Sequence, residues 1–142
     1  MLIYGGFYKK YNMGLFNRKK SRQNYNNDEK YEDLKRFDRT IKKNPNDIAA
    51  WNGKGCALIM HQRYDEAIKC FDRAIEIEPI NPEWGFIWGN KGFAFEQSGR
   101  YEEAIKCYDK ALEIDPDDGI NKMRPSREEL LEKISKNKDN PL

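Results

Sequence analysis

Apolar residues recur along residues 48–116 at intervals of three and four, which is the spacing of one face of an α-helix. The first stripe consists of Trp51, Gly55 and Leu58, and the second consists of Ala67, Phe71 and Ala74. Polar residues at 61–63 separate the two stripes, and Pro79 follows the second. Proline cannot continue a helical hydrogen-bond ladder, so it ends the second helix. The pattern therefore predicts two antiparallel helices joined by a tight turn.

The same pattern is present twice, with a constant offset of 37 residues. Residues 51–55 recur as 88–92, residues 63–74 as 100–111, and residues 76–79 as 113–116. Self-similarity at a fixed period of this size indicates a solenoid of stacked supersecondary units. The sequence therefore predicts an all-α chain that forms a short right-handed α-solenoid of antiparallel helix pairs. We expect its helices near residues 47–61, 64–77, 84–98 and 101–114.

The spaced residues resemble the tetratricopeptide repeat. Each unit has Trp, then Gly four residues later, then Leu or Phe, followed by Ala, an aromatic residue, Ala and Pro. The residue before the glycine is usually Leu in that family but is Lys54 or Lys91 here, which we expect to weaken one small packing contact. The family period is about 34 residues. The three extra residues of this chain are expected within residues 80–85, where they lengthen the connection between units.

The segments on either side of the two complete repeats predict partial units. Residues 28–46 read as a half-repeat that caps the N-terminal end, because Asp33 and Thr40 stand where the complete repeats have Ala. The complete repeats occupy residues 47–81 and 82–118. Residues 126–137 are expected to form a capping helix that opens with a capping box of Ser126 and Glu129. Together these segments form a repeat domain over residues 28–137, which leaves a tail at 138–142.

Residues 1–27 form a basic arm rich in aromatic residues. The whole chain has a net charge of +2, but residues 1–30 carry seven Lys or Arg and two acids. By contrast, residues 48–84 carry four basic and six acidic residues, and residues 85–118 carry four and eight. A basic aromatic segment can bind single-stranded nucleic acid, but we favour a solvated arm or one that packs on its own domain. Residues 1–12 precede a second possible start at Met13, so they are consistent with translation from an upstream codon.

The sequence holds little catalytic chemistry. The single histidine, His61, falls at a helix–turn junction where a surface residue is expected. Cys56, Cys70 and Cys107 follow helix faces and lack the spacing of a zinc site or a disulfide framework. We therefore expect no enzymatic activity, no metal and no cofactor. An odd number of cysteines, no long apolar stretch and no signal peptide predict a cytoplasmic protein without membrane association.

The resemblance also implies a binding site. In tetratricopeptide proteins the first helices line a concave groove that takes an extended peptide or a helix. The residues predicted for this groove are Asn52, Cys56, Ile59, Met60, Phe86, Asn90, Phe93 and Gln97. Asn52 and Asn90 are expected to hydrogen-bond a peptide backbone. The apolar members have an alternative role, which is to pack between adjacent first helices or beneath the arm.

We therefore predict a non-catalytic protein–protein interaction adaptor whose partner is a protein or peptide. The basic residues of the carboxylate clamp found in chaperone-binding relatives are absent from the groove, so we expect no preference for an acidic C-terminal tail. The alternative is a nucleic-acid-associated protein that contacts phosphates through the arm, although nucleic acid is the less favoured partner. Two complete repeats are fewer than the three or so usually needed for stability, so modest stability or self-association is expected.

Overall fold

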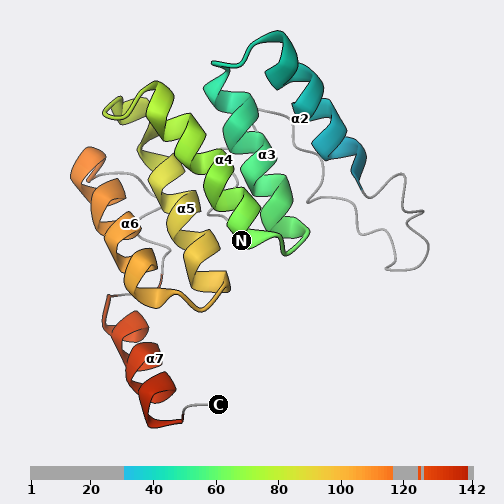
Figure 1. The fold of residues 1–142 in the computed structure, drawn as a ribbon. Helices are drawn as coiled ribbons and strands as arrows, with labels where there is room; N and C mark the ends of the chain where they lie inside the picture. Colours follow the sequence, from blue (N-terminus) through green and yellow to red (C-terminus); the bar gives the residue numbers. More distant parts are fainter. Residues whose placement is uncertain (1–30, 117–124, 126, 141–142) are drawn as a thin grey trace, which may run out of the picture.

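The computed structural model describes residues 31–116, 125 and 127–140. Its elements in chain order are α2 (Glu32–Lys43), α3 (Ile48–Met60), α4 (Tyr64–Ile77), the short 3-10 helix η3 (Pro82–Trp84), α5 (Gly85–Gln97), α6 (Tyr101–Ile114) and α7 (Arg127–Asp139). Helices α3 and α4 form one hairpin and α5 and α6 a second, and each longer helix packs against the next one in the chain (Figure 1). The predicted all-α solenoid is confirmed.

The predicted repeat helices agree with the observed ones to within one residue at each end. Helix α3 begins after Asp47, whose carboxylate accepts a hydrogen bond from the backbone N–H of Ala50 at 2.9 Å. This side chain satisfies one of the N–H groups that the first helical turn leaves unpaired. Helix α2 lies within the predicted half-repeat. The predicted arm at residues 1–27 and Ser126 of the predicted capping box lie outside the described residues.

In each repeat, an aromatic ring of the second helix packs against a glycine of the first helix. A Cβ atom added to Gly55 of α3 would lie 2.5 Å from Cε1 of Phe71 in α4, and one added to Gly92 would lie 2.6 Å from Cδ1 of Tyr108. Phe71 is fully buried and Tyr108 is nearly so. The two glycines thus let the helices of each pair approach closely.

The three extra residues lie where the sequence predicts them. Four residues, 44–47, join α2 to α3, whereas seven residues, 78–84, join α4 to α5 and include η3. The Glu78 carboxylate holds the longer connection together, because its Oε2 accepts hydrogen bonds from Asn81 Nδ2 at 2.8 Å and from Trp84 Nε1 at 3.0 Å. Trp84 then packs edge-to-face on Phe86, with ring centroids 5.8 Å apart. The insertion therefore adds an aromatic ring at the start of α5.

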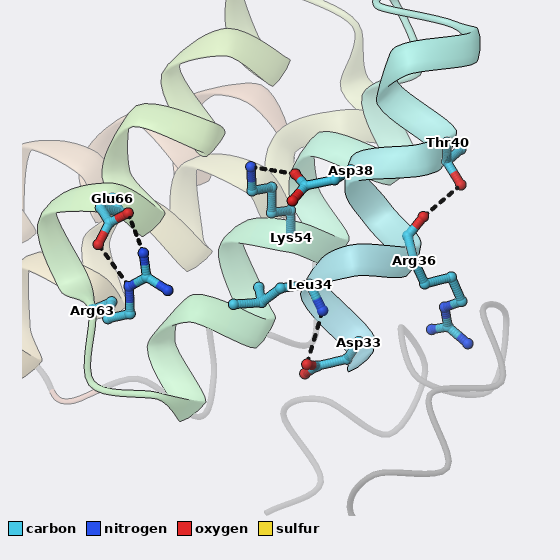
Figure 2. A network of polar contacts seen from close by, with 8 residues as sticks. All are labelled: Asp33, Leu34, Arg36, Asp38, Thr40, Lys54, Arg63 and Glu66. Atoms are coloured by element: carbon cyan, nitrogen blue, oxygen red, sulfur yellow. Dashed lines mark hydrogen bonds and ion pairs between the residues drawn. The ribbon is translucent and has the colours of Figure 1, made fainter. Parts of the chain in front are cut away.

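Lys54 and Lys91 replace the packing of the usual leucine with an ion pair between helices. Nζ of Lys54 lies 2.6 Å from Oδ1 of Asp38 in α2 (Figure 2), and Nζ of Lys91 lies 2.6 Å from Oδ1 of Asp72 in α4. Asp38 and Asp72 occupy equivalent positions in successive second helices. The same ion pair thus joins each second helix to the first helix of the next unit, a compensation that the sequence prediction of a weakened contact did not include.

The C-terminal helix α7 uses the same carboxylate position for its own attachment. Asp109, the equivalent of Asp72 in α6, pairs with Arg127 at 2.5 Å, and Lys133 pairs with Glu96 of α5 at 3.1 Å. Leu130 is 1% exposed and supplies the apolar contact. Helix α7 continues to Asp139, two residues beyond the predicted end of the capping helix, so part of the predicted tail is helical. In Figure 1 it lies at the end of the stack beyond α6.

The turns between the helices of each pair differ in one residue that adopts a left-handed conformation. Gln62 has φ 59°, and its equivalent in the second repeat, Gly99, has φ 77°. A side chain in this region costs energy that glycine avoids. We expect Gln62→Gly to raise the free energy of unfolding by about 0.5–1 kcal/mol, and Gly99→Gln to lower it by a similar amount. Urea unfolding monitored by circular dichroism measures the free energy of unfolding of both variants. A loss of stability in Gln62→Gly would contradict the left-handed conformation of residue 62.

Candidate functional site

The two first helices, α3 and α5, lie in contact through residues that the sequence assigned to the groove. Five of the eight predicted residues retain exposed surface. Met60 is 44% exposed, Gln97 is exposed, and Ile59, Phe86 and Phe93 are partly buried. Phe86, Phe93 and Gln97 follow one stripe of α5, and Ile59 and Met60 form the end of α3. We refer to these five residues as the α3–α5 face.

The other three predicted residues require a correction. Asn52 is fully buried, Cys56 is 4% exposed and Asn90 is 7% exposed. Asn90 Nδ2 donates a hydrogen bond to Asn52 Oδ1 at 3.0 Å and lies 3.6 Å from Cys56 Sγ. Burying an amide is costly unless it is hydrogen-bonded. One hydrogen bond joins the two amides across the repeat boundary, and Asn52 Nδ2 donates to Cys56 Sγ at 3.9 Å. In this structure they join α3 to α5, and they do not present hydrogen-bonding groups to a peptide.

A difference between the two copies of the motif signals this buried pair. The first repeat reads Asn52-Gly53, whereas the second reads Gly89-Asn90, so the asparagine moves by one helical position. One position corresponds to a rotation of roughly 100° about the helix axis. This rotation lets the two side chains meet from neighbouring helices instead of lying in parallel on one surface.

His61 is not the surface residue that the sequence predicts. Its side chain is 13% exposed, its Nε2 lies 3.4 Å from Oδ1 of Asp33, and its ring lies 5.2 Å from that of Tyr31. Both partners belong to the start of the α2 segment, 28 or more residues earlier in the chain. His61 therefore joins the end of α3 to the beginning of the described chain, a contact that local sequence could not reveal.

The cysteines also lie in the interior of the fold. Cys56, Cys70 and Cys107 are all buried. Burial raises the pKa of the Cys56 thiol to about 12 and that of Cys70 to about 11, because the apolar surroundings disfavour the thiolate. Among the described residues, no group of three or more His, Cys, Asp or Glu side chains is placed to hold a metal ion. None of the described helices has the length and apolar character required to cross a membrane.

Trp84 is a residue that the sequence prediction of the site missed. It belongs to the inserted connection and packs on Phe86, so its ring extends the α3–α5 face at the start of α5. The signal for it was the position of the insertion, which falls immediately before the first helix of the second repeat. The α3–α5 face therefore runs from aromatic residues at the start of α5 to Met60 and Gln97 at the helix ends.

The chain contains stacked antiparallel helix pairs, and the first helices of both pairs contribute to one surface. This arrangement defines a helical-repeat protein of the α-solenoid class. A family model for the tetratricopeptide repeat matches residues 48–81 and 86–118, so these two segments are tetratricopeptide repeats. Proteins of this family are typically non-catalytic and generally bind protein partners.

Two known proteins illustrate the similarity. Over 55 residues, or 39% of this chain, the sequence is 38% identical to a peroxisomal targeting signal receptor of Candida glabrata, and the match spans only 9% of that receptor's length. The fold resembles the MamA RS-1 ArsTM double mutant with a TM-score of 0.53 and 20% identity, covering 75% of this chain and 62% of that one. The second similarity concerns the fold alone.

Proposed function

We propose that this chain is a non-catalytic adaptor that binds an extended peptide or a helix of a protein partner on the α3–α5 face. The observation that carries the proposal is the character of this face. Met60 exposes 44% of its surface at the end of α3, and the partly exposed rings of Phe86 and Phe93 lie on one stripe of α5. Apolar anchors at helical spacing, with an amide at Gln97, suit the burial of apolar side chains from a partner.

The distribution of charge narrows the class of peptide. Lys54 and Lys91 are the lysines of α3 and α5, and both pair with aspartates of the preceding helices. Glu96 of α5 is also engaged, because its carboxylate accepts hydrogen bonds from Tyr108 and Lys133. The face therefore favours a peptide whose anchors are apolar over one with an acidic C-terminal tail. The name of the Candida glabrata relative, a receptor for a targeting signal, is consistent with a peptide partner.

The proposal includes the absence of catalysis and a cytoplasmic location. Cys56 and Cys70 have raised pKa values that disfavour the nucleophilic thiolate. The His61 ring is in contact with Asp33 and Tyr31. An odd number of cysteines without the spacing of a disulfide framework is in keeping with a reducing compartment. The alternative function, nucleic-acid binding through residues 1–27, rests on sequence composition, because that arm lies outside the described residues. Binding to phosphates weakens steeply with salt, whereas apolar contacts do not.

Selection from a displayed peptide library tests this function. The selected peptide is titrated calorimetrically against the full chain, Met60→Glu and Leu112→Glu. Leu112 is the matched control because it is 43% exposed, like Met60, but lies on α6. We expect Met60→Glu to weaken binding by at least about tenfold, since it places a charge against an apolar anchor, and Leu112→Glu to have little effect. Equal affinity of all three chains would reject the α3–α5 face as the binding site. Binding that is lost only when the salt concentration is raised would reject it too.

A further inference from the structure

Helix α2 presents a row of basic side chains to solvent. Five exposed Lys and Arg residues follow one side of the helix at intervals of one, three and four positions, which is the spacing of a single helix face. The apolar residues lie on the opposite side. Leu34 is 6% exposed, and the Phe37 ring packs where a Cβ atom on Gly53 of α3 would collide with it. We refer to the exposed residues as the α2 cation row, which consists of Lys35, Arg36, Arg39, Lys42 and Lys43.

The carboxylates of α2 leave most of this row without an ion pair. Asp33 and Asp38 are directed to the α3 side, where Asp38 lies 2.6 Å from Lys54. Figure 2 shows the Arg36 side chain pointing away from α3. Glu32 pairs with the first lysine of the row at 3.0 Å. The other four cations form no ion pair with any carboxylate in the part of the chain that the structure describes.

The equivalent helices of the two complete repeats neutralise the corresponding cation. In α4, Arg73 pairs with Glu76 at 3.2 Å, and α6 repeats this pair at 3.0 Å between a lysine and a glutamate three positions later. Helix α2 keeps the cation as Arg39 but has Lys42 where the other two helices have the glutamate. One change of residue type therefore turns an ion pair into two cations one turn apart.

Two further positions show that the row is particular to α2. Arg36 occupies the position of Cys70 and Cys107, which are buried in α4 and α6. Lys43 occupies the position of Ile77, which is partly buried in α4. Cations in the last turn of a helix complement its dipole, but the last turns of α4 and α6 contain none. The row is therefore a feature of the N-terminal end of the described stack, where Figure 1 places α2.

The geometry of the row suits a ladder of phosphates. It extends over positions 35–43, which is about 12 Å at about 1.5 Å per residue. Phosphates on one strand of a nucleic-acid duplex follow each other at about 3.4 Å along the duplex axis, so the row can meet about three or four of them. Lysine and arginine both bind phosphate, and the planar arginine group does so with two parallel hydrogen bonds.

Three observations favour a duplex over other partners. In the described part of the chain, none of the exposed large apolar residues belongs to α2, whereas a protein partner needs apolar anchors and a single strand stacks on exposed rings. The apolar side of α2, which would have to enter an anionic membrane, is packed against α3. Residues 44–142 carry 14 basic and 19 acidic residues, so the rest of the chain repels a polyanion.

We propose that the α2 cation row binds the phosphate backbone of a nucleic-acid duplex without reading its base sequence. This site goes beyond the proposed function, because the row includes no residue of α3 or α5. It also differs from the contact that the sequence suggests for residues 1–27, since all of its residues belong to α2. The two surfaces allow one chain to hold a peptide and a duplex at the same time.

Fluorescence anisotropy of a labelled DNA duplex of about 20 base pairs tests the site, with the full chain titrated between about 50 and 200 mM salt. Lys42→Glu restores the glutamate that the other two second helices have beside the equivalent of Arg39, so it is compatible with the fold. We expect it to weaken binding at least about tenfold at low salt and to reduce the slope of log affinity against log salt by about one to two. Circular dichroism checks that the variant keeps its helices.

The matched control is Lys69→Glu, which makes the same change of charge at an exposed lysine of α4. It is expected to change the affinity less than about twofold, whereas Lys42→Arg keeps the wild-type affinity and salt dependence. Duplexes of unrelated sequence are expected to bind equally well, because phosphates carry no base information.

Four results would overturn the proposal. The first is no binding of the duplex at low salt, and the second is an equal loss of affinity in Lys42→Glu and Lys69→Glu, which would show a general effect of net charge. The third is an unchanged affinity in Lys42→Glu together with a loss in a variant carrying Lys19→Glu and Lys20→Glu, which would move the contact to residues 1–27. The fourth is tighter binding to phosphatidylserine vesicles than to the duplex, which would assign the row to a membrane surface.

Discussion

Replacement of Phe71 by Ala is expected to reduce the free energy of unfolding by about 3–5 kcal/mol. The Phe71 ring is fully buried, and it lies on the backbone of α3 where Gly55 leaves room for it. Truncation removes this contact and leaves a cavity at the centre of the first repeat, which the rigid helix pair cannot fill by a small shift. Typical domains have a stability of only about 5–15 kcal/mol, so much of the folded population would be lost at physiological temperature.

Urea unfolding of the full chain, followed by circular dichroism, measures this effect. Phe93→Ala is the matched control because it removes the same side chain from α5, where that side chain retains exposed surface. We expect the control to lose less than half as much stability as Phe71→Ala. Losses of similar size in the two variants would show that the Phe71 ring is not the core contact that the structure shows.

Cys56 of the folded chain is expected to react with iodoacetamide at pH 8 about 10²–10³-fold more slowly than in the denatured chain. Its pKa is raised from 9.0 to about 12 by burial, so the reactive thiolate is rare. Access of the reagent is also blocked, because the side chain lies beneath the α3–α5 face with Asn52 and Asn90. Mass spectrometry of quenched samples measures the rate for each cysteine, and Cys70, with a pKa of about 11, serves as the internal comparison. Rapid alkylation of Cys56 would mean that α3 and α5 separate readily.

The same pKa shift makes stability depend on pH in a defined direction. The folded-state pKa of Cys56, about 12, lies above the ordinary value of 9.0, so the folded chain holds this proton more tightly than the unfolded chain does. The resulting stabilisation is complete below pH 9 and is lost as the pH rises from 9 through 12. Across this range, the free energy of unfolding is expected to depend less steeply on pH in Cys56→Ala than in the wild-type chain.

The stacking of the repeats combines an apolar core with one recurring polar contact. The carboxylates of Asp38, Asp72 and Asp109 each bind a cation from the next helix in the stack, and the last of these cations is Arg127 of α7. Exposed ion pairs of this kind contribute little individually, typically under about 1 kcal/mol. Their regular placement instead favours a consistent register between neighbouring units, and α7 uses the same position to attach to α6.

The sequence alone determined the helices, their pairing and the location of the insertion. These features follow from local information: apolar residues at helical spacing, proline at the ends of the second helices, and a motif that recurs after 37 residues. Gly55 and Phe71 recur in the second unit as Gly92 and Tyr108, and the contact between glycine and ring recurs with them. Repetition converts one local pattern into a tertiary arrangement, since each unit contacts only its neighbours.

Only the tertiary structure decided which predicted site residues are accessible. The family resemblance assigns Asn52, Cys56 and Asn90 to the predicted groove, but it does not include the neighbouring helix that buries them against one another. The partners of His61, Lys54 and Lys91 were likewise undetermined, because each lies on a different helix and the pairing depends on how the helices are rotated in the stack. Periodicity specifies the face of a helix on which a side chain lies, whereas its exposure depends on the side chains that the next helix brings against that face.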